Sequence, residues 1–91
     1  MPFALDLPDH LRRAGWKVKI RDKERLEPPH VTILFKARTW RPDLRTREFL
    51  ERGSGWAGID PGVRAAIEAS WSELCSAWDS MYPSNAVGEQ E

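Results

Sequence analysis

The sequence has few of the residues that form cross-links and metal sites. Cys75 is its single cysteine, so neither an intramolecular disulfide nor a multi-cysteine zinc site can form. Its two histidines, His10 and His30, belong to no recognisable spacing of metal ligands. We therefore expect no metal site, no cofactor and an inert, buried thiol at Cys75. The near-absence of cysteine favours a cytoplasmic protein.

Long hydrophobic runs are also missing. No apolar run approaches the roughly 20 residues of a membrane-spanning helix, and residues 1–6 lack the basic flank and apolar centre of a signal peptide. The 91 residues are 41 % hydrophobic and 31 % charged, which is typical of a small globular protein. We therefore expect one domain over residues 1–83, a polar, disordered tail over residues 84–91 and no membrane partner.

The formal net charge is zero because oppositely charged segments cancel. Residues 11–52 carry thirteen basic and six acidic side chains, whereas residues 53–91 carry one basic and six acidic side chains. Such an asymmetry can attract a phosphate backbone or an acidic protein. An alternative stays open, in which the basic strands and the acidic helix neutralise each other.

The first half of the chain predicts a short helix and two strands. Residues 8–14 suit a helix that begins at a proline and ends at Gly15. Residues 16–21 alternate between apolar and basic side chains, as a half-buried strand does. Residues 30–36 form the most apolar run and predict the second strand, behind a stiff pair of prolines.

The second half predicts two more strands and a helix. Residues 39–44 and 47–50 are joined by short connections, which indicates an antiparallel meander. Asp60 caps a helix that begins at Pro61 and ends near Pro83. Apolar residues recur in it every three or four positions: Val63, Ile67, Trp71, Leu74, Trp78 and Met81.

These elements predict an α+β fold. A small antiparallel β-meander of three to four strands carries one long C-terminal helix on one face and a short N-terminal helix. Pro42 cannot donate to a strand ladder, so the third strand is expected either to lie at an edge or to be bulged there. An edge strand of this kind could receive a partner protein.

His30 is the first candidate functional residue. It follows Pro28–Pro29 and lies three residues after Glu27, whose carboxylate could fix its tautomer. Together with nearby arginines, an imidazole of this kind could move a proton during metal-free cleavage of a phosphodiester. The alternative is a strand-edge histidine with an ordinary hydrogen bond.

A set of basic residues is the second candidate site. If the strand and the hairpin that carry them face the same way, they form a stripe suited to an RNA or DNA backbone or to an acidic partner. Trp40 among them could stack on an unpaired base, or it could belong to the core. The set comprises Lys17, Lys19, Arg21, Arg38, Trp40, Arg41, Arg45 and Arg47.

Parts of the sequence resemble a small bacterial family of unknown function. The specific part is Pro28-Pro29-His30-Val31, which is similar to the family's Pro-Pro-His-hydrophobic-His motif, although Thr32 replaces the second histidine. Gly15-Trp16 before an alternating strand and the Ala77-Trp78 pair in the helix fit the same pattern. Members of this family are often encoded beside a second small protein, in pairs that resemble toxin–antitoxin modules.

Two functions follow from these observations. The first is a protein-interaction component of a toxin–antitoxin-like two-gene system, with a small acidic protein as partner. The alternative is a small RNA-acting effector, either a ribonuclease or an RNA-binding protein, that uses His30 and the basic hairpin. Whether the protein is an enzyme stays open, as do its oligomeric state and the sheet face that the helix covers.

Overall fold

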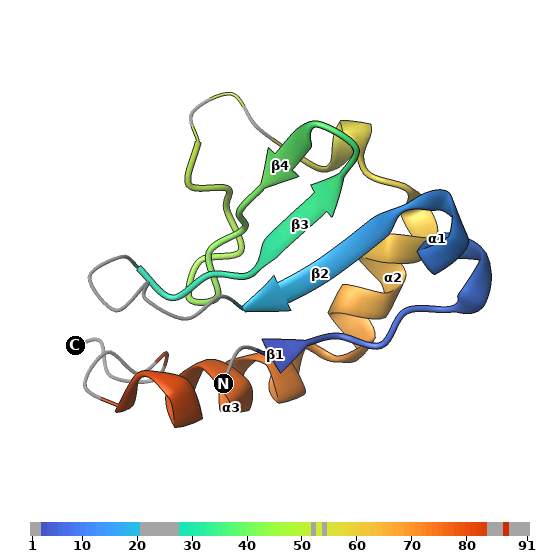
Figure 1. Ribbon diagram of the computed structural model, residues 1–91. Helices are drawn as coiled ribbons and strands as arrows, with labels where there is room; N and C mark the ends of the chain where they lie inside the picture. Colours follow the sequence, from blue (N-terminus) through green and yellow to red (C-terminus); the bar gives the residue numbers. More distant parts are fainter. Residues whose placement is uncertain (1–2, 21–27, 52, 54, 84–86, 88–91) are drawn as a thin grey trace.

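The structure, a computed structural model, describes residues 3–20, 28–51, 53, 55–83 and 87. The chain forms a small sheet backed by helices (Figure 1). Its elements, in chain order, are β1 (Phe3–Ala4), α1 (Asp9–Ala14), β2 (Trp16–Ile20), β3 (Thr32–Phe35), β4 (Arg38–Trp40), the 3₁₀ turn η1 (Trp56–Gly58), α2 (Pro61–Ala69) and α3 (Trp71–Met81).

The four strands form one antiparallel sheet in the order β1-β2-β3-β4, which confirms the predicted α+β meander. The strands at the two edges of the sheet differ from the predicted ones. Phe3–Ala4 adds an N-terminal strand that no sequence pattern marked. Residues 47–50, which were expected to form a fourth strand, contribute only an isolated bridge between Pro42 and Phe49.

The predicted edge position is confirmed, because β4 is the last strand of the sheet. Near Pro42, however, the chain folds back over this edge. The β3–β4 pairing continues past β4 through a bridge between His30 and Asp43. On the outer side, the Asp43 N–H donates to the Glu48 carbonyl at 2.7 Å, and the Leu50 N–H donates to the Arg41 carbonyl at 2.9 Å. Near Pro42, the backbone groups that a partner strand would use are therefore already bonded within the chain.

The short helix α1 ends at Gly15, as predicted. Gly15 adopts a left-handed conformation with φ of 107°, which suits glycine because it has no Cβ. Leu7 and Leu11 are both buried beside it. The helix begins after Pro8 without a side-chain cap.

The expected long helix is divided into α2 and α3 at Ser70. Asp60 caps α2 as predicted, since its Oδ1 accepts a hydrogen bond from the Gly62 N–H at 2.7 Å. At Ser70 the backbone leaves helical geometry, with φ of −109° and ψ of 19°, and the axis changes direction between the two helices (Figure 1). The apolar stripe continues through the break, so sequence periodicity could not reveal it.

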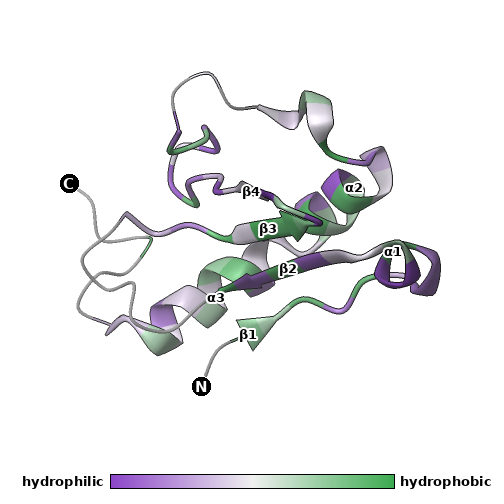
Figure 2. Ribbon diagram, turned by 45° about the horizontal axis from the view of Figure 1, so that its top comes forward, coloured by the Kyte–Doolittle hydropathy of each residue, from purple (hydrophilic) through white to green (hydrophobic). Residues whose placement is uncertain are grey.

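The core lies between one face of the sheet and the two C-terminal helices. From the sheet it takes alternate residues of β2 together with Ile33 and Trp40, and from the helices it takes Val63, Ile67, Leu74 and Trp78. Figure 2 shows hydrophobic colours over β3, whereas β2 also carries hydrophilic positions. This pattern agrees with a strand that has one buried and one open face.

The C-terminal segment is described only at Val87. Its N–H donates to Asp79 Oδ1 at 2.7 Å, and its carbonyl accepts from Arg45 Nε at 3.1 Å. Val87 is also half-buried against the core. Val87 is therefore held by α3 and by the segment after β4. The disordered tail stays a prediction, because residues 84–86 and 88–91 lie outside the described part.

Candidate functional site: an open, lysine-bearing sheet face

The strand register separates the sheet into a covered face and an open face. Residues directly opposite one another on paired strands project from the same face. The cross-strand rows Ala4–Lys19–Thr32 and Lys17–Leu34–Thr39 therefore project from one surface, which we call the lysine face. Thr32 is buried on this face, so it is open around the other five positions only. Trp16, Val18 and Ile33 project the opposite way and are buried beneath the helices.

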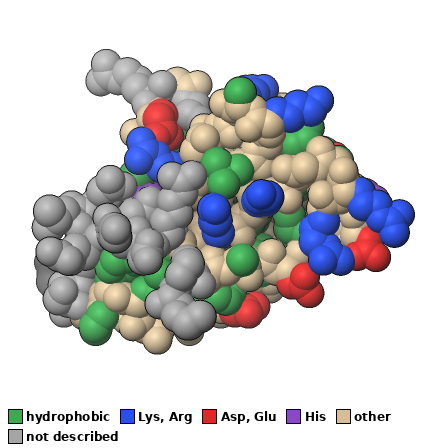
Figure 3. All heavy atoms as spheres, viewed as in Figure 1, with side chains coloured by type: hydrophobic (Ala, Val, Ile, Leu, Met, Phe, Trp, Pro, Cys, Tyr) green, Lys and Arg blue, Asp and Glu red, His purple; other side chains and the backbone are tan. Residues whose placement is uncertain are grey.

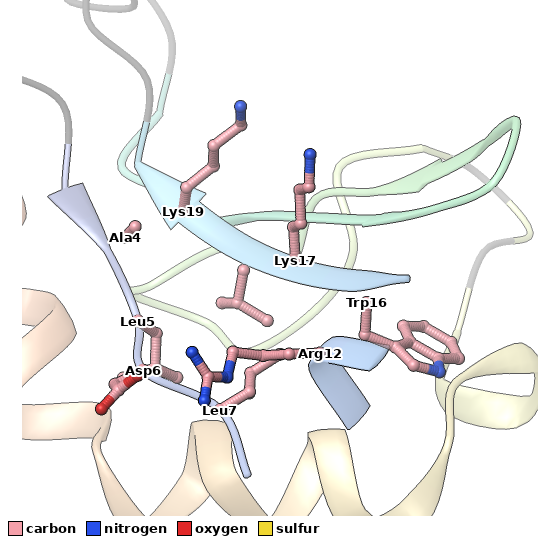
Figure 4. A pocket seen from close by; sticks show the side chains of 9 residues that line it. Ala4, Leu5, Asp6, Leu7, Arg12, Trp16, Lys17 and Lys19 are labelled. Atoms are coloured by element: carbon pink, nitrogen blue, oxygen red, sulfur yellow. The ribbon is translucent and has the colours of Figure 1, made fainter. Parts of the chain in front are cut away.

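Lys17 and Lys19 stand on the lysine face and point away from the helices (Figure 4). Lys17 is exposed and Lys19 is half-exposed. Neither forms an ion pair with any residue in the described part of the chain. Figure 3 shows basic side chains over the middle of β2, surrounded by hydrophobic and neutral surface. Which face the helices cover was open from sequence, and the answer leaves these two lysines available.

His30 lies in the core rather than at the surface. Its side chain is 0 % exposed, and its ring centroid lies 5.6 Å from that of Trp78 in α3. Nδ1 lies 2.8 Å from the Pro28 carbonyl, so Nδ1 carries the proton and donates to it. An acid–base group has to reach its substrate, and this placement instead fits a packed, hydrogen-bonded core residue. The catalytic prediction for His30 gains no support, and Glu27 lies outside the described residues.

Two residues of the predicted basic hairpin interact on the helix side of β4. Trp40 is buried, which agrees with the core alternative, and its ring lies 5.7 Å from that of Trp16. The Arg38 guanidinium carbon lies 4.6 Å from the centre of the Trp40 ring, and the group packs against Gly58 of η1. Stacking of this kind keeps Arg38 on the side of the sheet opposite Lys17.

The remaining arginines are engaged within the chain. Arg41 forms a half-buried ion pair with Glu51, and Arg45 donates to the Val87 carbonyl. The Arg47 guanidinium lies 4.5 Å from the centre of the Trp71 ring in α3. The hairpin arginines therefore do not join the lysines in one stripe, and Arg21 lies outside the described residues. Sequence spacing could not show this, because the partners come from distant segments.

Cys75 is half-buried on α3. Burial raises the pKa of its thiol above the ordinary value, and the nearby Asp79 carboxylate raises it further, whereas Arg47 acts in the opposite direction. A raised pKa keeps the thiol protonated near neutral pH, and the thiolate is the reactive form. The expected inert thiol therefore agrees with its surroundings.

A groove lies between β2 and the segment that connects β1 to α1 (Figure 4). The chain leaves β2 after the Leu5 N–H donates to the Val18 carbonyl at 2.8 Å, and it returns through α1. The opening has a volume of about 550 Å³. Its lining residues are Ala4, Leu5, Asp6, Leu7, Arg12, Trp16, Lys17, Val18 and Lys19.

The sequence contained no signal for this groove. Its outer wall depends on the two-residue strand β1, which is too short to show a period. The groove joins Lys17 and Lys19, which the sequence singled out, to Arg12, which it did not.

Within the described residues, no group of three or more histidine, cysteine or carboxylate side chains could hold a metal ion. In the same part of the chain, every helix is too short or too polar to cross a bilayer. Comparison with family models, curated proteins and solved structures gave no match. The resemblance to the Pro-Pro-His family therefore stays a prediction.

Proposed function

We propose that the protein is a binding module whose lysine face docks an acidic partner protein. The observation that carries this proposal is the placement of Lys17 and Lys19 on the uncovered side of the sheet, without an ion pair in the described structure. Charges that are free before docking steer encounter and select a partner of opposite sign. A partner encoded as the second member of a toxin–antitoxin-like gene pair is the finer form of this proposal.

The alternative RNA-acting effector has less support. Its catalytic part relied on an accessible His30, which is buried, and its phosphate-holding part relied on arginines that stack or pair within the chain. Of the predicted basic set, as far as the structure describes it, only Lys17 and Lys19 remain to attract a phosphate backbone. RNA binding without cleavage is therefore the form of the alternative that the test below includes.

The test is co-expression with the product of the neighbouring gene, followed by an affinity measurement at two salt concentrations. We expect Lys17→Glu/Lys19→Glu to weaken binding at least about tenfold, mainly through slower association. A matched control, Arg13→Glu/Lys36→Glu, makes the same charge change at two exposed sites that form no ion pair in the described structure, one on α1 and one in the β3–β4 turn. It should bind almost normally.

Equal losses of affinity in the two variants would contradict the proposal. The electrostatic field of the whole protein, rather than the lysine face, would then attract the partner. RNA that binds the parent protein more tightly than the protein partner does, with a steep salt dependence, would favour the alternative.

A further inference from the structure

We infer that the groove beside β2 receives an extended acidic segment of the partner, with an apolar side chain on its floor and carboxylates at its cationic rim. This inference rests on the proposed function and names the part of the partner that binds. Three features of the groove carry it: its lining, its charge and the spacing of its lysines.

The lining combines an apolar floor with a basic rim. Ala4 and the half-buried Leu5 supply accessible apolar surface, with the buried Leu7 and Val18 beneath them. The volume of about 550 Å³ lies within the roughly 300–1,000 Å³ of ligand pockets. An apolar floor gives a bare phosphate backbone little to bury. A peptide side chain such as leucine gains about 25 cal/mol for each Å² that it removes from water there.

The charge of the groove is complementary to carboxylates. Three cationic side chains line it, against a single carboxylate from Asp6. Arg12 reaches toward the Leu5–Leu7 segment, and the two lysines project on the other side of β2 (Figure 4). Arg12 also pairs with Asp9, but both side chains are more than half exposed, so an incoming carboxylate can compete for it.

The spacing of the lysines matches an extended peptide. Lys17 and Lys19 are two residues apart on one strand, so they leave the same face about 6.6 Å apart. Acidic side chains at alternate positions of an extended segment have the same spacing. β1 pairs with β2 only as far as Val18, so no described strand lies beside Trp16 and Lys17 on this side. An extended segment can therefore lie along this part of the groove.

The test uses the intact, isotope-labelled protein and a synthetic hexapeptide that alternates glutamate and leucine. We expect the peptide to shift the NMR signals of backbone amides in Leu5, Val18 and Lys19. A peptide that alternates lysine and leucine should shift none of them. Shifts confined to Leu34 and Thr39, or no shifts at millimolar peptide, would overturn the inference.

Two variants separate the groove from the face as a whole. Ala4→Trp places a bulky side chain at an exposed position that lines the groove, and we expect it to weaken peptide binding about tenfold. Thr39→Trp places the same bulk on the same face but outside the groove and should bind normally. Both positions are exposed, so both variants should fold.

The failure of this inference is distinguishable from failure of the proposed function. If the neighbouring gene's product still needs both lysines but tolerates Ala4→Trp, the groove assignment is wrong and the proposed docking face stands. If that product binds the Lys17→Glu/Lys19→Glu variant as well as the parent, both are wrong. An RNA oligonucleotide that shifts the same amides when the acidic peptide does not would also overturn the inference.

Discussion

At the scale of single residues, Trp78 holds the two layers of the molecule together. It is the largest fully buried side chain, and it contacts His30 from the sheet side and Tyr82 at the end of α3, with ring centroids at 5.6 and 4.2 Å. Trp71, seven residues earlier on the same stripe, is only half-buried under the Arg47 guanidinium. We therefore expect the two tryptophans to contribute unequally to the stability of the folded protein.

We expect Trp78→Ala to lower the free energy of unfolding by ~3–5 kcal/mol, because it leaves a cavity that the core cannot refill. Trp71→Ala should have a clearly smaller effect. Urea denaturation followed by far-UV circular dichroism measures the stability of both variants. Equal losses of stability would contradict the difference in burial between Trp78 and Trp71.

A second residue-scale prediction concerns the Cys75 thiol. Because burial and Asp79 raise its pKa in the folded state, a colorimetric thiol reagent should modify it more slowly at pH 8 than it modifies the urea-unfolded chain. The unfolded state releases this proton at lower pH, so the folded state should lose stability as the pH rises through the ordinary thiol pKa. Cys75→Ser should lack that alkaline loss; an identical pH profile would contradict the shift.

At the scale of elements, the β3–β4 hairpin contains a strained turn. Its two-residue loop is Lys36–Ala37, and Lys36 has φ of 55°, where non-glycine residues are disfavoured. We expect Lys36→Gly to stabilise the protein by up to about 1 kcal/mol, because relief of the left-handed strain outweighs the entropic cost of glycine. Ala37→Gly, at a residue without positive φ, is the matched control and should destabilise it. Thermal denaturation measures both, and a change of the same sign in the two variants would contradict this reading of the turn.

The start of α2 gives a further element-scale prediction. Asp60→Ala removes the acceptor for the Gly62 N–H and should lower stability by about 1 kcal/mol. Asp60→Asn retains a side-chain oxygen that can accept this hydrogen bond, so it should lower the free energy of unfolding much less. Urea denaturation of the two variants compares them, and equal losses would show that the negative charge matters more than the cap.

At the scale of the whole molecule, one apolar cluster joins all the larger elements. Residues of β2, β3, β4, α1, α2 and α3 belong to the same buried core, and the radius of gyration is 12.6 Å. We therefore expect a single cooperative transition in which tryptophan fluorescence and far-UV circular dichroism change together with denaturant. Two separate transitions would show that α3 or the N-terminal elements unfold independently.

The sequence predicted what local patterns determine. Alternation along β2 identified both of its faces, Gly15 and Asp60 marked helix ends, and the apolar stripe identified the residues of α2 and α3 that enter the core. It could not reveal β1, whose two residues carry no period, or the break at Ser70, where the stripe is uninterrupted. The burial of His30 and the engagement of the arginines depend on partners distant in the chain, so spacing alone could not show them.

The sheet has no long free edge in its described part, and this affects how the protein behaves at high concentration. On one side the Glu48–Leu50 segment bonds to Arg41 and Asp43; on the other side β1 is only two residues long. Long bare strand edges are the templates on which chains stack into fibrils. The unpaired stretches in the described part, β4 and the Trp16–Lys17 end of β2, are only two or three residues long. Because so short an edge is a poor template for stacking, the folded protein should stay dispersed in concentrated solution.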